Sequence, residues 1–255
     1  MTQWIRYAEG GVPGFGRLDG TRIEAYAGDL FGSKQPTGRT LALDAVVVLT
    51  PTAAGKMVAL WNNFRALAEK LGNPVPAEPL YFIKANSSYL ATGQTIRMPK
   101  SYSGKVVFEG ELGIVIGKTC RAVPETEAQS HIFGYTCIND VTAVDLLHRD
   151  NTFAQWTRAK SFDTFGVFGP VVATDLDPMQ LSVRTVLNDQ ERQNYPLSDM
   201  VFPPARLVSL ISQDMTLDPG DVIACGTSIG VGSMKSGSTV AVSIAGIGTL
   251  INRFE

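Results

Sequence analysis

Histidine is the scarcest of the residues that carry chemistry in this chain, with only His131 and His148 among 255 residues. Most catalytic triads and imidazole-rich metal sites would have to use one of these two. Cysteine is nearly as rare, because Cys120, Cys137 and Cys225 form an odd set with no C-x-x-C pair. The shortage excludes a disulfide framework and a thiolate zinc site, and it favours a reducing compartment.

Further absences narrow the class of protein. Lysine and arginine number 22 against 24 aspartates and glutamates, so the net charge of -2 offers no basic excess for nucleic acid. No segment approaches the roughly 18 uninterrupted apolar residues of a membrane helix, and the first ten residues do not form a secretory signal. We therefore expect a cytoplasmic protein that binds neither nucleic acid nor membranes.

The residues that are present indicate a folded chain of two parts. With 44% hydrophobic and 18% charged residues, it can bury a substantial core. Short extended runs broken by turns predict a small β-rich N-terminal domain over residues 1–54. A periodic apolar pattern from Lys56 to Leu71, ended by Gly72 and Pro74, predicts an amphipathic helix, at least in its second half.

Strands should dominate the second domain, residues 55–255. Runs rich in Val, Ile, Phe and Thr predict strands at 80–84, 105–116, 133–140, 167–173, 181–187, 221–225 and 239–244. Helices are expected near 125–132, 142–150 and 204–213. Because the strands outnumber the helices and do not alternate regularly with them, we predict an α+β, mainly β fold rather than a doubly wound parallel sheet.

Two carboxylates interrupt the most strand-like segment, residues 106–116. Residues i and i+2 of a strand point to the same face, about 7 Å apart. Glu109 and Glu111 would therefore repel each other unless something positive lies between them. A divalent cation would satisfy both, and a solvated face of an edge strand is the alternative.

Other candidates lie further along the chain. Asp140 could reach into a site from a strand end, or it could cap a following helix. Lys160 could neutralise charge beside a metal, or it could be an ordinary surface lysine. Three carboxylates without histidine would make an all-oxygen site, which suits Mg2+ or Mn2+ rather than zinc or copper.

A glycine-rich loop at residues 224–232 lacks the spacing of a dinucleotide site or a P-loop. Its backbone N–H groups could approach a small carboxylate, or the segment could be a plain tight turn. His131 and His148 are expected to pack or to face solvent. His148 remains a remote candidate for proton transfer because it follows Asp145 by three residues.

The ordered motifs of residues 56–255 resemble the fumarylacetoacetate hydrolase family. They are Phe108-Glu109-Gly110-Glu111-Leu112-Gly113-Ile114-Val115-Ile116-Gly117, Gly134-Tyr135-Thr136, Asn139-Asp140-Val141-Thr142-Ala143, Asp145, Ala159-Lys160-Ser161-Phe162-Asp163, Phe168-Gly169-Pro170, Met215-Thr216-Leu217, Pro219-Gly220-Asp221, Gly226-Thr227 and Gly246-Ile247-Gly248-Thr249-Leu250. Any one motif is weak, but the ordered set is specific.

The resemblance implies a mixed β-sandwich roll behind a small N-terminal domain, assembled as a homodimer. It implies activity on a small 2-oxo acid or dicarbonyl with Mg2+ or Mn2+. The metal-ligand positions of the family fall on Glu109, Glu111 and Asp140, and Lys160 matches the lysine beside metal and substrate. Gly226 and Thr227 match the loop that receives the carboxylate end of the substrate.

One departure concerns a helix over the site, where many family members carry a histidine and a glutamate that activate water. Glu69 matches the glutamate, but the histidine position falls on Arg65 or Ala66, and neither is a base near neutral pH. Glu69 alone would then have to activate water.

A second departure lies in the glycine-rich loop, where the family's Gly-Thr-Pro is replaced by Gly226-Thr227-Ser228. Arg65 could bind a second carboxylate of the substrate. The pocket for the substrate tail is expected near Trp61, Asn63, Arg65, Tyr81, Phe82 and Lys84.

We therefore predict a divalent-metal-dependent enzyme that cleaves a carbon-carbon bond in a small 2-oxo acid through a metal-bound enolate. The reaction would be acylpyruvate-type hydrolysis or decarboxylation of a 3-carboxy-2-oxo acid. One alternative is an isomerase or hydratase of a 2-hydroxydienoate or 2-oxoalkenoate in aromatic catabolism, which would use the same enolate. Another is a catalytically idle protein that binds metal and oxo acid.

Overall fold

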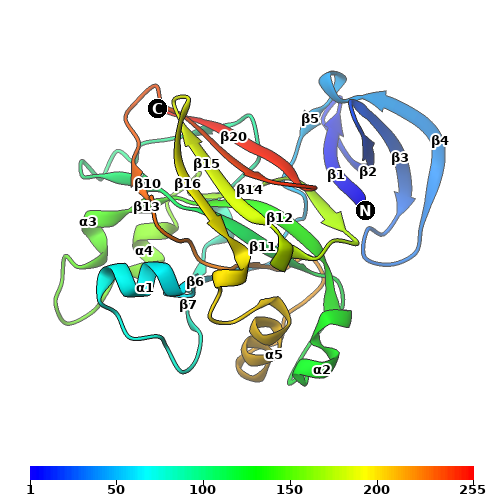
Figure 1. Ribbon diagram of the computed structural model, residues 1–255. Coiled ribbons are helices and arrows are strands. Elements are labelled where there is room, and N and C mark those ends of the chain that lie inside the picture. Colours follow the sequence, from blue (N-terminus) through cyan, green and yellow to red (C-terminus); the bar gives the residue numbers. More distant parts are fainter.

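The computed structural model describes all residues from Met1 to Glu255 and has three sheets and five short α-helices (Figure 1). The largest sheet has twelve strands. Its main path runs β4 (Lys34–Ala42), β3 (Arg22–Gly28), β2 (Val12–Asp19), β1 (Thr2–Glu9), β14 (Gly166–Thr174), β12 (Ile132–Asp140), β11 (Gly110–Ile116), β17 (Val222–Ala224), β6 (Met57–Trp61) and β7 (Leu80–Lys84), while β5 (Val47–Val48) pairs with β1 and β8 (Tyr89–Leu90) with β14.

Two smaller sheets and the helices complete the chain. The five-stranded sheet has the order β16 (Gln190–Pro196), β15 (Ser182–Leu187), β19 (Thr239–Ile244), β20 (Gly248–Phe254) and β9 (Thr95–Ile96). The three-stranded sheet contains β13 (Thr142–Ala143), β10 (Val106–Phe108) and β18 (Gly232–Ser233). The helices are α1 (Arg65–Leu71), α2 (Glu125–Ala128), α3 (Val144–Leu147), α4 (Trp156–Lys160) and α5 (Pro204–Asp214). The mainly β class predicted from the sequence is confirmed. None of the helices is long and apolar enough to cross a membrane.

The N-terminal strands are continuous with the large sheet. β1 pairs with β2 on one side and, through Thr2 to Trp4, with β14 on the other. The ammonium of Lys34 lies 5.2 Å from the ring centre of Trp4 and 5.6 Å from that of Phe133 in β12. The first fifty residues therefore attach to the remainder both by strand pairing and by a cation held between two aromatic rings.

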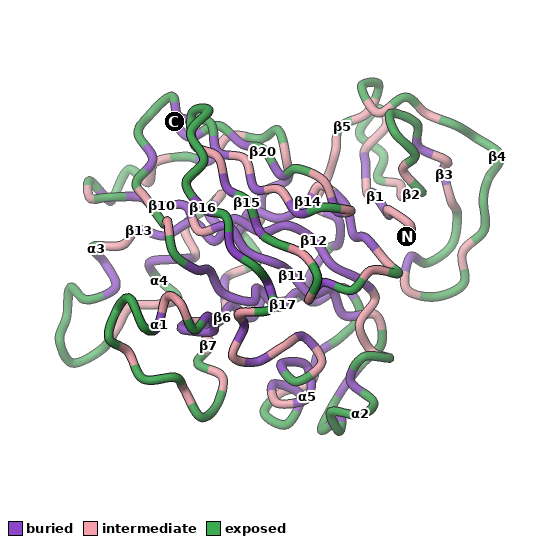
Figure 2. The backbone as a smooth tube through the Cα atoms, viewed as in Figure 1, coloured by how far each residue is buried: buried purple, intermediate pink, exposed green.

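The large sheet curls around an apolar interior. β7 is four strands away from β12 in the sheet, which would separate them by about 19 Å if the sheet were flat. Lys84 at the end of β7 nevertheless contacts Asp140 at the end of β12. The chain then crosses to β8, which pairs with β14. Apolar side chains fill the inside of the curl: Ala59, Phe82, Val115, Ile138, Phe168, Val172 and Val222. Figure 2 shows the central strands as almost wholly buried.

The helix predicted at residues 56–71 is confirmed in its second half, whereas its first half is a strand. Met57 to Leu60 are all buried in β6, which runs parallel to β17 and antiparallel to β7. A short run of buried apolar residues is a signal that strand and helix share, so the periodicity could not separate them. Only α1 is helical, and Gly72 ends it in the left-handed conformation at φ 68°.

Other boundaries also differ from expectation. The predicted strand 105–116 is two strands, β10 and β11, which belong to different sheets. The predicted helix 142–150 is reduced to α3, because Thr142 and Ala143 pair with β10. The helix expected over 125–132 ends as α2 at Ala128 and continues as a 3-10 turn. Helix α5 confirms the prediction for 204–213.

Candidate metal centre

Glu109 and Glu111 flank the point where the chain passes from one sheet to another. Glu109 lies between β10 and β11, and 13% of its side chain is exposed. Glu111 lies within β11, is completely buried and points into the curl, on the same face as Val115. Because β11 is an interior strand between β12 and β17, the solvated edge-strand alternative is wrong.

Asp140 is the last residue of β12 and is fully buried. One carboxylate oxygen accepts a hydrogen bond from Nζ of Lys84, and the other accepts one of 2.6 Å from Nζ of Lys160. No helix begins at Asp140, since α3 starts at Val144 without a side-chain cap. The helix-cap alternative is therefore wrong, and the buried carboxylate is balanced by two ammonium groups instead.

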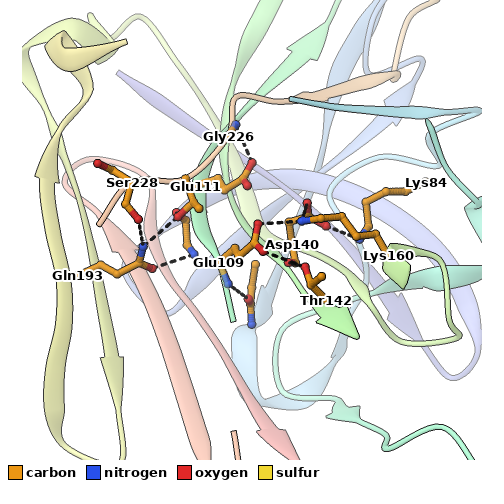
Figure 3. A network of polar contacts seen from close by, with 12 residues as sticks. Lys84, Glu109, Glu111, Asp140, Thr142, Lys160, Gln193, Gly226 and Ser228 are labelled. Atoms are coloured by element: carbon orange, nitrogen blue, oxygen red, sulfur yellow. Dashed lines mark hydrogen bonds and ion pairs between the residues drawn. The ribbon is translucent and has the colours of Figure 1, made fainter. Parts of the chain in front are cut away.

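Lys160 connects two of the three candidate carboxylates. It is the last residue of α4 and is only 2% exposed, so it is not a surface lysine. Its Nζ donates to Glu109 Oε2 at 2.7 Å and to Asp140 Oδ2 at 2.6 Å (Figure 3). The other oxygen of Glu109 accepts from the Thr142 hydroxyl at 2.9 Å.

Burial and mutual charge shift the pKa values of this cluster in different directions. Burial raises the pKa of Glu111 well above its usual range, and the charge of Asp140 adds to the shift. Burial also raises the pKa of Glu109, although Lys160 opposes this. Burial alone would raise the pKa of Asp140, but the two lysines hold it below the ordinary value.

The two lysines also differ from each other. Burial lowers the pKa of Lys84, despite the attraction of Asp140. Burial opposes the charge of Lys160 too, but the carboxylates of Asp140 and Glu109 outweigh it and raise its pKa. The pKa shifts of the two lysines therefore differ in direction, because Lys160 contacts two carboxylates and Lys84 contacts one.

The donor set fits a divalent cation that prefers oxygen. One oxygen from each of Glu109, Glu111 and Asp140 lies within 4.8 Å of the others. Two ligands on opposite sides of Mg2+ are about 4.2 Å apart, so small side-chain movements would suffice. Oε1 of Glu111 is buried and has no hydrogen-bond partner. A buried acceptor without a donor is costly, and a cation would satisfy it.

The glycine-rich loop meets this cluster through its backbone. The N–H of Gly226 donates to Glu111 Oε2 at 2.9 Å, so the loop approaches a carboxylate of the protein itself. Gly226 has φ 88°, which favours glycine. The hydroxyl of Thr227 donates to the carbonyl of Gly110 at 2.9 Å. The loop and β11 are therefore tied together.

The two residues predicted on α1 are not brought to the cluster. Arg65 donates to the backbone carbonyls of Met200 and Asp199, and the Asp199 carboxylate accepts from the N–H of Ala66. The side chain of Glu69 is exposed and makes no hydrogen bond or ion pair, while its backbone carbonyl accepts from the N–H of Gly72. Lys84, expected to line a tail pocket, is wholly buried against Asp140 instead.

The histidines lie outside the cluster. His148 is exposed, and its ring centre is 6.5 Å from that of Trp156. Asp145 accepts from the N–H of Lys105 rather than from His148. His131 lies near the carbonyl of Lys118.

Three further residues of the site were not predicted. Asn139 accepts from the N–H of Glu109 at 3.0 Å, which fixes the backbone there. Gln193 and Tyr195 reach Gly110 from β16, a strand of the five-stranded sheet. No sequence signal marks these two, because their role depends on how two sheets pack.

Cation binding should weaken as the pH falls. Burial raises the pKa of Glu109 and Glu111 above 4.5, so protons compete with the cation over a range where exposed glutamates stay ionised. Below the raised values, the Mn2+ dissociation constant should rise by about tenfold per pH unit for each proton displaced. Titration calorimetry at a series of pH values measures this, and a constant affinity would contradict it.

The folding stability of the metal-free protein should depend on pH in the opposite direction to its cation affinity, as far as Glu109 and Glu111 are concerned. A raised pKa in the folded state means that the contribution of Glu109 and Glu111 is present at low pH and is lost as the pH rises through those values. Asp140 acts in the other direction, because its pKa is lowered in the folded state. Its contribution to stability is present at neutral pH and is lost as the pH falls through that lowered pKa. Thermal unfolding with and without Mn2+ separates the two effects.

Comparison with known proteins identifies what this arrangement is similar to. Residues 56–255 match the family model for the fumarylacetoacetate (FAA) hydrolase C-terminal domain, and residues 2–51 match the Rv2993c-like N-terminal model. A 2-hydroxyhepta-2,4-diene-1,7-dioate isomerase from Mycobacterium marinum superposes with a TM-score of 0.91 at 38% identity, covering 100% of this chain and 98% of that one.

Two further relatives carry isomerising activities in their names. A 5-carboxymethyl-2-hydroxymuconate delta-isomerase from Mycobacterium smegmatis superposes with a TM-score of 0.90 at 38% identity, covering 99% of this chain and 98% of that one. Oxaloacetate tautomerase YisK from Bacillus subtilis is 34% identical over 80% of this chain and 70% of its own length. The mixed sheets described above therefore form a known type of fold.

Proposed function

The chain belongs to the fumarylacetoacetate hydrolase family of enzymes, and from this premise we propose that it is a divalent-metal-dependent isomerase or tautomerase of a small 2-oxo acid. The observation that carries the proposal is the buried Lys160 ammonium, hydrogen-bonded to Glu109 and Asp140 beside the unpartnered oxygen of Glu111. The names of these three relatives support a reaction that moves a proton without cutting a carbon-carbon bond.

Keto–enol conversion moves a proton between C3 and the 2-oxo group of the substrate, so the negative oxygen that develops must be stabilised. Mg2+ or Mn2+ held by Glu109, Glu111 and Asp140 would polarise the 2-oxo group as a Lewis acid. Lys160 keeps its proton, so its Nζ serves to donate a charged hydrogen bond to the developing negative oxygen. Lys84 is completely buried and its Nζ is paired with Asp140, so we assign it the role of holding that carboxylate in place.

Hydrolysis is less well supported than isomerisation. Cleaving an acylpyruvate with water requires a base that activates the water. Glu69 is exposed and Arg65 is engaged with backbone carbonyls, so α1 brings no base to the cluster. Decarboxylation needs no such base and would use the same charge arrangement, so it stays the second candidate. The predicted cleavage of a carbon-carbon bond remains a prediction.

Products distinguish these reactions. The protein is incubated with Mg2+ and, separately, with oxaloacetate, an acylpyruvate and a 2-hydroxydienoate, and each reaction is followed by ultraviolet absorbance and by analysis of products. We expect faster interconversion of enol and keto forms, without CO2 or an acid fragment, and loss of this activity with a chelator. CO2 would identify a decarboxylase, an acid fragment a hydrolase, and no turnover of any substrate an idle binding protein.

The assembly and the location of the protein are further proposals. The family resemblance supports a homodimer that acts on a small molecule in the cytoplasm. The mass of the particle in solution, measured by light scattering, tests the homodimer.

A further inference from the structure

We propose that Gln193 and Tyr195 are positioning residues, which hold the two glutamates and the glycine-rich loop in the one arrangement that binds a divalent cation. The inference rests on the proposed metal site. Both residues belong to β16, in the five-stranded sheet, whereas Glu111 and Asp140 belong to the large sheet. They are spaced by two along the strand, so they point to the same face.

The residue that Gln193 and Tyr195 hold is Gly110, which lies between the two glutamates. Its N–H donates to Gln193 Oε1 at 3.0 Å. Its carbonyl accepts from the Tyr195 hydroxyl at 2.5 Å and from the Thr227 hydroxyl at 2.9 Å. Side chains from two other segments therefore fix both polar groups of the residue that joins the candidate ligands.

Gln193 extends the same connection to the glycine-rich loop. Its Nε2 donates to Thr227 Oγ1 at 2.8 Å. It also donates to the carbonyl of Ser228 at 3.2 Å (Figure 3). The loop returns to the cluster where the N–H of Gly226 meets Glu111. One buried amide thus links the strand that carries the carboxylates to the loop that faces them, and the contacts form a closed ring.

The space around Gly110 leaves little freedom for this arrangement to change. A Cβ atom built on Gly110 would lie 2.1 Å from Thr185 Oγ1 and 3.1 Å from Gln193 Oε1. Gln193 is 1% exposed and Tyr195 is 6% exposed. Glu109 and Glu111 repel each other, and metal ligands must stay within about 0.2 Å of their preferred distances. A fixed backbone between them meets both requirements.

The experiment compares Gln193→Met and Tyr195→Phe with matched variants outside the site. Asn252→Leu removes another buried amide that donates to two backbone carbonyls, and Tyr102→Phe removes another buried tyrosine hydroxyl that donates to a carbonyl. Mn2+ affinity is measured by calorimetry without substrate, and stability by thermal unfolding. Residues that orient metal ligands typically contribute about 10- to 100-fold to affinity.

We expect Gln193→Met to weaken Mn2+ binding by about tenfold or more and Tyr195→Phe by a few-fold. Asn252→Leu and Tyr102→Phe should lose comparable stability while keeping wild-type affinity. If Gln193→Met does not fold, Thr227→Val tests the same ring, and Thr227→Ser should restore affinity because it keeps the hydroxyl. Affinities of Gln193→Met and Tyr195→Phe within twofold of the wild type would overturn the inference.

The outcome is separable from that of the proposed function. A wild-type protein whose Mn2+ affinity depends on Gln193, but which converts no 2-oxo acid, would support the positioning role and refute the isomerase. A wild-type protein that binds no Mn2+ would overturn the positioning role.

Discussion

Replacing Asp140 by Asn is expected to abolish turnover and to destabilise the protein. The substitution preserves the shape of the side chain but removes the charge that two lysines share. Breaking a buried ion pair from one side costs about 3 to 5 kcal/mol, because the partner is left buried without compensation. The amide is also a much weaker ligand for a divalent cation than the carboxylate.

Turnover of Asp140→Asn should fall by about a thousandfold or more, beyond the loss typical of a single charge-stabilising donor. Mg2+-dependent conversion of the best substrate, Mn2+ calorimetry and urea unfolding measure the three effects. Asp221→Asn is the matched control, because Asp221 is 2% exposed and pairs with Lys56 outside the cluster. It should lose stability but keep turnover. Retention of a tenth of the activity by Asp140→Asn would remove Asp140 from the reaction.

Replacing Lys160 by Met is expected to separate turnover from metal binding. Without the ammonium, no charged donor faces the negative oxygen of the substrate, so turnover should fall by about 100- to 1000-fold. Glu109 and Asp140 would lose the cation that now lies between them. The affinity of these two carboxylates for Mn2+ should be unchanged or higher, because no Lys160 ammonium then competes with the metal for their negative charges.

The folding stability of Lys160→Met, measured with and without Mn2+, is a second readout of the role of the lysine. The metal-free variant should unfold more easily than the wild type, since two carboxylates stay buried without their partner, and Mn2+ should recover much of this loss. Lys56→Met, which breaks the ion pair with Asp221, is the matched control and should leave turnover intact. A large fall in Mn2+ affinity with Lys160→Met would show that the lysine organises the carboxylates instead of acting on the substrate.

Much of the candidate site could be predicted because its residues lie in short ordered motifs. Glu109, Glu111, Asp140 and Lys160 come from different elements, and the structure brings all four together. Local pattern alone left each of them with an alternative, such as an edge strand, a helix cap or a surface lysine. The family resemblance indicated the functional interpretation, and the burial of the residues excludes those alternatives.

The parts that could not be predicted depend on how distant strands pack. Lys84 was expected in a tail pocket, but the curl of the large sheet brings it to Asp140 across four strands. Gln193 and Tyr195 reach the site from a different sheet. The strand β6 resembled a helix because buried parallel strands lack the alternation of polar and apolar residues that identifies half-exposed ones.

Because β1 pairs with β14, the first fifty residues occupy an edge of β14 that would otherwise be unpaired. In a fragment that begins at residue 55, the backbone of Val172 to Thr174 would lose its partners on that side. Unpaired N–H and C=O groups at a strand edge invite a second molecule to add a strand. Such a fragment would tend to self-associate, and it would do so on a strand whose other neighbour, β12, ends in Asp140. The N-terminal segment therefore closes this edge of β14, although it contributes no residue to the acidic cluster.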